Sequence, residues 1–360
     1  MPVVTITDVA SRVGVSVATI SRFLSGGNVR EEKKIRSVIQ ELNYRPNIAA
    51  RNLKSGRSAT VAIIVPDISN PFFAAIVRGA EKASGDSLMA AIVNTDSNSE
   101  REINALANLY GRVDGAIFVP TKESDHKNGL SHFGRPIVFV DRYLQKEKKY
   151  DTVLADNARG AELAVEHFAS EGHTKIAIIS GPLDSTPGRQ REEGFRKALD
   201  NSKIGANPNY VIVSDFTQAG GYAAMSQLLD LAEPPTAVFS SNNLMTYGAL
   251  NALKDRGVRV PSDISFIGFD DFELSTLISP KITVINRDAE AQGAEAMRAL
   301  MWRLENMDSK ISKHSVIPVN LIKRESVTIP RTWDLQNSHK VKERQSQTSD
   351  HSNNKEKVNE

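Results

Sequence analysis

The chain has 360 residues, of which 40% are hydrophobic and 24% are charged, and its net charge is +2. This length allows more than one domain with a sizeable core, and the composition is ordinary for a globular protein in water. The sequence holds no cysteine, which excludes a disulfide framework and thiolate chemistry. It shows neither a charged-then-apolar leader nor an apolar run of membrane length, so we expect a cytoplasmic protein.

The first residues predict a pair of short helices. The pair spans residues 7–22 and turns tightly at Gly14, because glycine takes a left-handed conformation without strain. Thr7 and Ser16 are expected to cap the two helices, since a side-chain oxygen there can accept an unpaired backbone N–H. Apolar residues at helical spacing can close a small core between the helices: Ile6, Val9, Ala10, Val13, Val15, Ile20 and Leu24.

The second helix presents a face of mostly small residues that ends in an arginine: Val17, Ala18, Ser21 and Arg22. Such a face fits the DNA major groove, where arginine reads guanine edges and apolar groups contact thymine methyls. Residues 30–42 predict a third helix with one apolar stripe. Two amphipathic helices in any small helical domain would give part of this pattern. The three helices together favour a helix-turn-helix head that reads DNA.

Charge divides the chain at the same place. Residues 1–60 hold ten Lys or Arg and four Asp or Glu, a net of +6, so the rest of the chain carries −4. A basic module on a mildly acidic body suits contact with DNA phosphates. A run of charges is also typical of an ordinary solvated face.

Residues 46–58 form a candidate linker after the head. Pro46 suits a first helical turn, and residues 48–54 are too few to form a stable helix alone. We expect this segment to be disordered in the free protein and helical when bound to DNA.

Together with residues 44–54, the three helices resemble the LacI family of bacterial transcription regulators, and the resemblance resumes over 60–330. It implies that the hinge helix pairs with its dimer mate in the minor groove, where Leu53 wedges into the central base step and kinks the duplex. Leu53 could instead be an ordinary packing leucine. The residues expected to contact DNA are Thr7, Ser16, Val17, Ala18, Thr19, Ser21 and Arg22 in the head and Asn47, Ala49, Ala50 and Leu53 in the hinge.

From residue 60 onward, apolar runs of strand length alternate with amphipathic helices. The pattern restarts after about residue 156, which predicts an α/β protein with two doubly wound parallel-sheet lobes behind the helix-turn-helix head. Strands are expected at 60–66, 88–93, 115–119, 136–140, 175–180, 210–213, 237–240 and 264–268, and helices at 72–83, 100–110, 158–171, 190–201, 220–231 and 244–256.

The resemblance implies a periplasmic-binding-protein-like effector domain whose chain crosses between lobes near Asp156, Asn286 and Pro318. We expect a DNA-binding domain at 1–45, a hinge and linker at 46–58, and an effector-binding domain at 59–330. Its first lobe takes about 59–156 and 287–318, and its second about 157–285 and 319–330. Residues 331–360 are polar and are expected to be a disordered tail without an apolar heptad, which favours a homodimer over a tetramer.

Loops at the carboxyl ends of the strands are expected to hold the ligand site. By resemblance, Arg191 and Asp270 match the family's most consistent ligand contacts, with Asp270 accepting hydroxyl hydrogen bonds and Arg191 donating from the opposite wall. Phe73 and Phe216 could instead be core residues, and Arg142 could form a surface ion pair with Asp141. The other positions that match the family's pocket lining are Phe72, Phe73, Thr121, Arg142, Phe216 and Asn242.

These features predict a repressor of carbohydrate-utilisation genes whose binding to a pseudo-palindromic operator is modulated by a small sugar-like effector. Polyols suit carboxylates and guanidiniums beside an apolar wall. If Lys122, Arg142 and Arg189 converge, the effector would be anionic, a sugar acid or a sugar phosphate. A purine fits less well, because Ser185 and Pro187 replace polar residues of purine-binding relatives.

The sequence shows no catalytic constellation and no cofactor motif. It lacks a phosphate-binding loop, a dinucleotide glycine fingerprint and a nucleophile elbow, so we expect neither an enzyme nor a cofactor. Its histidines are scattered, so a metal site is not expected. Two other classes of protein are alternatives. A periplasmic solute-binding protein would need a signal peptide and no DNA-binding head, and a sugar kinase would need a phosphate-cradling loop and a base.

Overall fold

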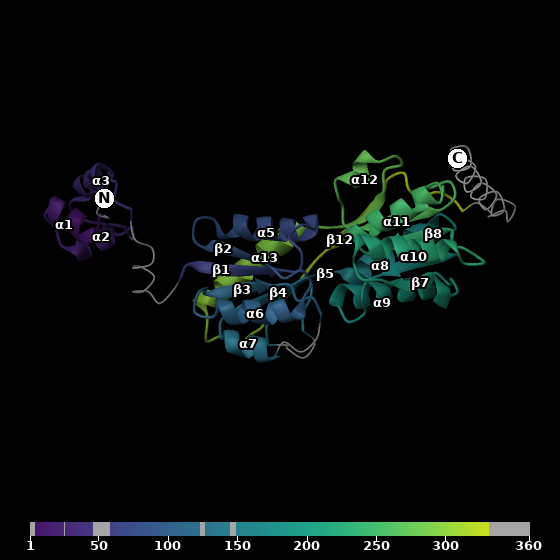
Figure 1. The fold of residues 1–360 in the computed structure, drawn as a ribbon, viewed down its shortest axis with the longest axis horizontal. Helices are drawn as coiled ribbons and strands as arrows, with labels where there is room; N and C mark the ends of the chain where they lie inside the picture. The colour runs from purple at the N-terminus through teal and green to yellow at the C-terminus, as the bar shows by residue number, and fades with distance from the viewer. Residues whose placement is uncertain (1–3, 25, 46–57, 123–126, 145–148, 331–360) are drawn as a thin grey trace, which may run out of the picture. The chain divides into compact units, whose positions relative to one another are not determined.

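The computed structural model describes residues 4–24, 26–45, 58–122, 127–144 and 149–330. They fall into two compact units, the first within 1–60 and 112–114 and the second within 61–111 and 115–360. Figure 1 shows the elements of both units. The hinge residues Asn47, Ala49, Ala50 and Leu53 and the tail 331–360 lie outside the described residues.

Three helices form the first unit: α1 (Ile6–Val13), α2 (Val17–Leu24) and α3 (Glu32–Glu41). Their apolar faces meet in one small core, with Val9, Ile20 and Ile35 fully buried. The turn after α1 is made by Gly14 at φ 82°, as the sequence predicts.

The cap of α1 differs from the prediction. Thr5 takes the cap position, since its backbone is extended and its hydroxyl accepts from the backbone N–H of Asp8. The Asp8 carboxylate in turn accepts from the backbone N–H of Thr5 at 2.8 Å, which completes a capping box. Thr7 therefore lies inside the first turn, exposed, and is not a cap. Ser16 caps α2 as expected, accepting from the backbone N–H of Thr19 at 3.2 Å.

The first lobe is a six-stranded sheet in the order β11-β5-β4-β3-β1-β2. The pairs β1–β3, β3–β4, β4–β5 and β5–β11 are parallel. Its strands are β1 (Thr60–Val65), β2 (Met89–Asn94), β3 (Gly115–Phe118), β4 (Ile137–Val140), β5 (Asp151–Ala155) and β11 (His314–Ile317). Its helices are α5 (Pro71–Ser84), α6 (Ser99–Leu109), α7 (Lys127–Phe133) and α13 (Ala289–Glu305).

The second lobe repeats this topology in the order β12-β10-β9-β8-β6-β7, with β12 antiparallel to β10. Its strands are β6 (Ile176–Ser180), β7 (Val211–Val213), β8 (Ala237–Ser240), β9 (Ser265–Phe269), β10 (Thr283–Arg287) and β12 (Val319–Ile322). Its helices are α8 (Asn157–Ser170), α9 (Thr186–Asn201), α10 (Gln218–Leu229), α11 (Asn243–Asp255), the short α12 (Leu274–Leu277) and a 3-10 turn at Pro208–Tyr210.

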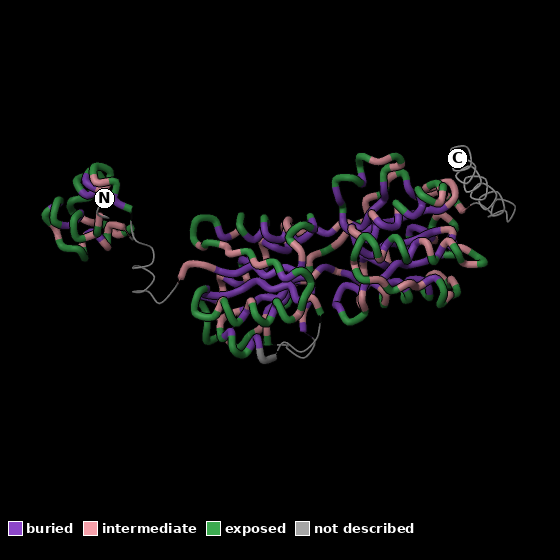
Figure 2. Tube along the Cα trace, viewed as in Figure 1, coloured by how far each residue is buried: buried purple, intermediate pink, exposed green. Residues whose placement is uncertain are grey.

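Paired helices cover both faces of each sheet. In the first lobe α5 and α13 pack together over one apolar face, and α6 and α7 lie on the other (Figure 1). In the second lobe α10 and α11 cover one core, and α8 and α9 cover the other. Figure 2 shows the strands buried inside each lobe and exposed residues on the outer helices. Burial on both faces explains the continuous apolar runs of the sequence.

Three connections join the lobes. The chain passes from β5 to α8 at Asp156, from β10 to α13 at Asp288, and from β11 to β12 at Pro318. Both Asp156 and Asp288 cap the helix that follows, so each crossing ends on a fixed helix start.

The two-lobe α/β architecture was predicted, but several elements were not. No element was predicted after residue 268, where the structure has α12, β10, α13, β11 and β12. Helix α9 begins at Thr186, four residues earlier than expected, because Ser185 caps it and Pro187 suits its first turn. Among the described helices, none has the length and apolar character needed to cross a membrane.

Candidate effector cleft and DNA-reading helix

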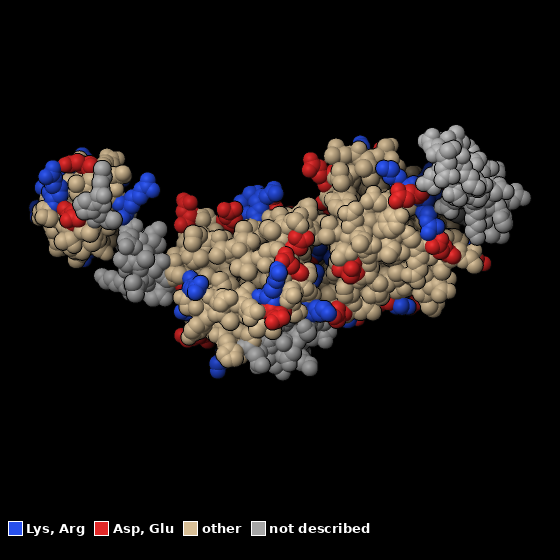
Figure 3. Space-filling view, in the orientation of Figure 1, with Lys and Arg blue, Asp and Glu red and all other residues tan. Residues whose placement is uncertain are grey.

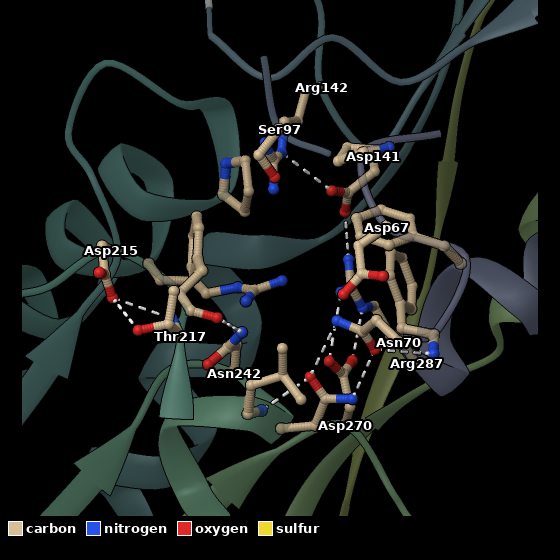
Figure 4. Close-up of a pocket in the computed structure, with 18 residues that line it drawn as sticks. Asp67, Asn70, Ser97, Asp141, Arg142, Asp215, Thr217, Asn242, Asp270 and Arg287 are labelled. Carbon is tan, nitrogen blue, oxygen red and sulfur yellow. Dashed lines mark hydrogen bonds and ion pairs between the residues drawn. The ribbon is translucent and has the colours of Figure 1, made fainter. Parts of the chain in front are cut away.

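A cleft opens between the two lobes where the strands of both sheets end (Figure 4). Its empty space is about 600 Å³ including the open mouth. Several of its residues lie in the loops after strands and cap the next helix, as Asn70 does for α5 and Asn242 for α11. This placement follows the general rule for ligands in open parallel sheets.

Seven of the eight predicted effector residues line this cleft: Phe72, Phe73, Arg142, Arg191, Phe216, Asn242 and Asp270. Thr121 does not line it. The Thr121 hydroxyl and backbone N–H both bond the buried carboxylate of Glu102, and its carbonyl accepts from Arg142 Nη1 at 2.8 Å. Thr121 therefore supports Arg142 from behind.

Arg142 is buried and does not form a surface ion pair. Its side chain is 9% exposed, and its Nε lies 3.4 Å from Asp141 Oδ2. Phe73 belongs to the core of the first lobe as well as to the cleft wall, and the half-buried Phe216 faces the Arg142 guanidinium at 5.4 Å.

The centre of the cleft holds an arginine that sequence reasoning missed. Arg287, at the end of β10, donates from Nε to Asp270 Oδ1 at 2.6 Å and from Nη1 to Asp141 Oδ1. Its guanidinium also lies 3.5 Å from the centre of the Phe72 ring. Figure 4 shows Arg287 between the two carboxylates, one from each lobe. The strand-end rule alone could have pointed to it, because Arg287 follows a buried apolar run.

Burial and neighbouring charges perturb these groups. Burial alone would raise the pKa of Asp141, but the charges of Arg287, Arg142 and Arg191 lower it below its usual range. Burial opposes the charge of Arg287, yet Asp270 and Asp141 together raise its pKa. Burial lowers the pKa of Arg142, and Asp141 opposes that shift.

Arg191 differs from the other two arginines of the cleft. It is 1% exposed, donates from Nε to Asn157 Oδ1 at 2.9 Å and from Nη1 to the Ser241 carbonyl, and lies 3.5 Å over the Phe269 ring. No ion pair joins it to any described residue, and its Nη2 has no hydrogen-bond partner among them. Burial first, and then Arg287, lowers the pKa of Arg191 to about 9.

The three cations proposed to converge do not. Lys122 is exposed and pairs with Asp184 at 3.7 Å, and Arg189 pairs with Glu193 on α9. Only Arg142 of that set lines the cleft, where it meets Arg191 and Arg287 instead.

Two polar contacts also join the lobes at the cleft. Asn243 Nδ2 donates to Asn70 Oδ1 at 2.8 Å, and the backbone N–H of Tyr143 donates to Thr186 Oγ1 at 3.2 Å. The side-chain oxygens of Asn70 and Asn243 also accept from backbone N–H groups at the starts of α5 and α11. The contact between the two asparagines therefore joins the N-terminus of α5 to that of α11.

The head presents the predicted DNA-facing residues of α2 on its surface. Val17 is 41% exposed, Ala18 and Arg22 are exposed, and Thr19 and Ser21 are half-buried. Figure 3 shows basic and acidic side chains interspersed on the visible face of the protein. Across the described ranges, no group of three or more His, Cys, Asp or Glu side chains is placed to hold a metal ion.

Comparison with known proteins gives relatives along nearly the whole chain. Catabolite control protein A of Priestia megaterium is 35% identical over 317 residues, which cover 86% of this chain and 95% of the relative. The HTH-type transcriptional repressor PurR of Haemophilus influenzae (strain PittEE) is 35% identical over 334 residues, covering 90% and 98%.

Solved structures of transcription regulators also resemble this chain over nearly its whole length. The lac repressor dimer bound to operator and the anti-inducer ONPF superposes with a TM-score of 0.79 at 28% identity, covering 91% of this chain and 100% of that one. The complex of the transcriptional regulator CelR with cellobiose gives a TM-score of 0.69 at 31% identity, covering 90% and 99%.

A helix-turn-helix head joined to a two-lobed effector domain defines a DNA-binding transcription regulator. A protein-family model described as bacterial regulatory proteins, lacI family, matches residues 5–47. A second family model, described as a periplasmic binding protein-like domain, matches residues 165–327. The chain belongs to the LacI family. The predicted family and fold class are confirmed, and the relatives are transcriptional repressors and not enzymes.

Proposed function

We propose that this protein represses carbohydrate-utilisation genes and that a small sugar-derived effector, bound between the lobes, modulates its hold on the operator. The class includes sugar acids and sugar phosphates. The observation that carries the proposal is the meeting of phenylalanine rings with guanidiniums, carboxylates and amides in one interlobe cleft. Rings cover the apolar faces of a sugar while the polar groups bond its hydroxyls. The cellobiose complex of CelR supports this ligand class.

On the DNA side, we propose that α2 enters the major groove of a pseudo-palindromic operator. A homodimer would place two heads on the two half-sites. The hinge residues Asn47, Ala49, Ala50 and Leu53 would contact the minor groove, with Leu53 as the wedge. The protein would act in the cytoplasm. The lobe and linker boundaries expected from the sequence belong to the same proposal.

Arg22→Ala tests the DNA side. An operator is first recovered by selecting random DNA on the full chain, and affinities are then measured by mobility shift at fixed salt. Loss of a bidentate base contact costs about 1–3 kcal/mol, so Arg22→Ala should weaken specific binding by roughly five- to 150-fold. Arg36→Ala is the control, because Arg36 is another exposed arginine of the head and pairs with Glu32 on α3.

If Arg22→Ala bound the operator as tightly as the wild type, the proposal that α2 enters the major groove would be wrong. Equal losses of operator affinity in Arg22→Ala and Arg36→Ala would point to a non-specific effect of charge instead.

A thermal-shift panel of sugars, sugar acids and sugar phosphates tests the effector side. If no member stabilises the protein or alters operator binding, the sugar-effector proposal fails.

A further inference from the structure

Arg287 lies where the two lobes and the cleft meet. It is the last residue of β10, and Asp288 after it caps α13, so it occupies one of the three lobe connections. Its side chain is 4% exposed. It bonds Asp270 of the second lobe and Asp141 of the first, and its guanidinium covers the Phe72 ring.

Arg287 already bonds the carboxylates that would accept hydrogen bonds from the hydroxyls of a neutral sugar. Both oxygens of Asp270 lie against Arg287, Oδ1 at 2.6 Å from Nε and Oδ2 at 3.3 Å from Nη2. Asp141 Oδ1 bonds Arg287 Nη1, and its Oδ2 lies 3.4 Å from Arg142 Nε. A sugar hydroxyl that donates to Asp270 or to Asp141 Oδ1 must compete with charge-assisted bonds, which are about twice as strong as neutral ones, and one that donates to Asp141 Oδ2 meets an ion pair with Arg142.

Arg191, in contrast, donates hydrogen bonds but has no carboxylate in the described part of the chain to accept them. Arg191 is buried with neutral acceptors only, the Asn157 amide and the Ser241 carbonyl, and its Nη2 bonds none of the described residues. A buried cation is normally paired, because leaving it without a counter-ion is costly. Arg142 is compensated by Asp141 and, from outside the cleft, by the carboxylate of Glu102. Arg191 is therefore the cleft cation that lacks a carboxylate partner among the described residues.

We propose that the cleft selects an effector with an anionic group, a carboxylate or a phosphate, that pairs with Arg191, and that Arg287 determines this choice by neutralising Asp141 and Asp270. The proposal rests on the proposed function, a sugar-derived effector in this cleft. Glu102 compensates Arg142 from outside the cleft and both aspartates pair with Arg287, so an anionic group on the ligand supplies the counter-ion that Arg191 lacks among the described residues.

Titration calorimetry of the full chain at pH 7 and constant ionic strength tests the charge preference. The probes are two matched series: glucose, glucuronate and glucose 6-phosphate, and ribose and ribose 5-phosphate. At least one anionic sugar should bind ten or more times as tightly as its neutral parent. The carboxylate and phosphate arms show which anion fits.

Arg287→Gln tests the specificity role. The change leaves both carboxylates free to accept from sugar hydroxyls and to compensate Arg191, so the preference for the anion should fall at least fivefold and neutral sugars should bind more tightly. Arg287→Lys keeps the charge and should keep the anion preference. Arg256→Gln is the control, since Arg256 is an ion-paired arginine on the second lobe outside the cleft, and it should match the wild type. A melting curve for each variant shows that it is folded.

The outcomes separate the inference from the function beneath it. Tighter binding of a neutral sugar than of its anionic forms overturns the inference and leaves the sugar effector standing. An anion preference that Arg287→Gln leaves unchanged overturns the role of Arg287. Binding of no sugar of either kind removes the proposed effector class and the inference with it.

Discussion

Several residues that line the cleft have a strained backbone. Asp141, Phe216 and Asp270 have positive φ values of 64°, 65° and 72°, a region that non-glycine residues rarely adopt. Each such residue costs on the order of 1–3 kcal/mol and persists where the surrounding structure holds it. Glycine would relieve the strain but would lose the carboxylates and the ring that line the cleft. The retained side chains are thus consistent with a binding role.

Buried polar residues outside the cleft have a structural role, and His173 is an example. Its ring nitrogens lie 2.9 Å from Thr236 Oγ1 and Ser265 Oγ and 2.8 Å from the Thr328 carbonyl, so it ties the last described segment to the second sheet. Burial lowers the pKa of His173 below its usual value, despite the nearby Thr328 carbonyl and Glu171.

The sign of this shift predicts acid sensitivity. Below pH 6.5 the unfolded chain protonates His173 while the folded protein resists, so stability falls with falling pH. We expect the melting temperature of the wild type to drop more between pH 7.5 and 5 than that of His173→Gln. The glutamine keeps a donor and an acceptor, and His167, whose pKa burial also lowers, is common to both proteins. Parallel melting curves across this pH range would contradict the assignment.

At the scale of elements, two helices of the first lobe approach each other closely through glycine. A Cβ on Gly293 of α13 would lie 1.9 Å from the Ile76 carbonyl oxygen of α5, and one on Gly79 of α5 would lie 2.0 Å from the Glu290 carbonyl oxygen. Neither glycine has a positive φ, so the reason for glycine here is space and not backbone conformation.

Gly293→Ala should therefore push α5 and α13 apart. Overpacking of this kind costs about 1–3 kcal/mol, and the midpoint of urea unfolding should fall accordingly. Gly205→Ala is the matched control, because a Cβ there meets no atom within 4 Å, and it should leave the midpoint near the wild-type value. A Gly293→Ala protein as stable as the control would show that the two helices can adjust at little cost.

The sequence predicted those elements whose pattern is local. Strand β8 was predicted at its observed bounds, because a short apolar run between turn residues is enough to define it. Helix α13 was missed although Ala296, Leu300 and Leu304 repeat every four residues, so its signal was present in the sequence. Strands β11 and β12 are short and half exposed, and only pairing with distant strands stabilises them.

The same distinction applies to the cleft. Arg191 and Asp270 were predicted from local motifs that resemble the family's ligand contacts, Arg191 before Glu-Glu-Gly-Phe on α9 and Asp270 in Ile-Gly-Phe-Asp after β9. Arg287 was missed because β10, the strand that it ends, was not predicted, and its pairing with Asp141, 146 residues away in the sequence, leaves no local pattern. Thr121 was predicted for the pocket, but Glu102, buried on α6, draws its side chain away. No local pattern records such pairings, since they arise only when the lobes fold.

At the scale of the whole effector domain, the lobes are joined by three chain crossings and by bonds across the cleft. Asn70–Asn243 and Arg287–Asp141 both link groups of opposite lobes, so a ligand in the cleft competes with or reinforces contacts that set the lobe arrangement. A ligand can shift that arrangement only by binding one form better than another. Effector reception should therefore be separable from DNA reading by a substitution within the cleft.

Arg191→Gln should make that separation. The variant should bind the selected operator as the wild type does, because no residue of the head is changed. It should bind the effector found in the sugar panel about ten- to a hundredfold more weakly, since a hydrogen bond to a charged group contributes about 1.5–3 kcal/mol. Effector that releases wild-type protein from DNA should then leave the variant bound. Arg189→Gln is the control, because Arg189 lies one helical half-turn away, pairs with Glu193 and does not line the cleft. Calorimetry with the effector and mobility shift with the operator, on both variants, decide the matter: wild-type effector affinity in Arg191→Gln would remove Arg191 from the site, and lost operator binding would give it a structural role.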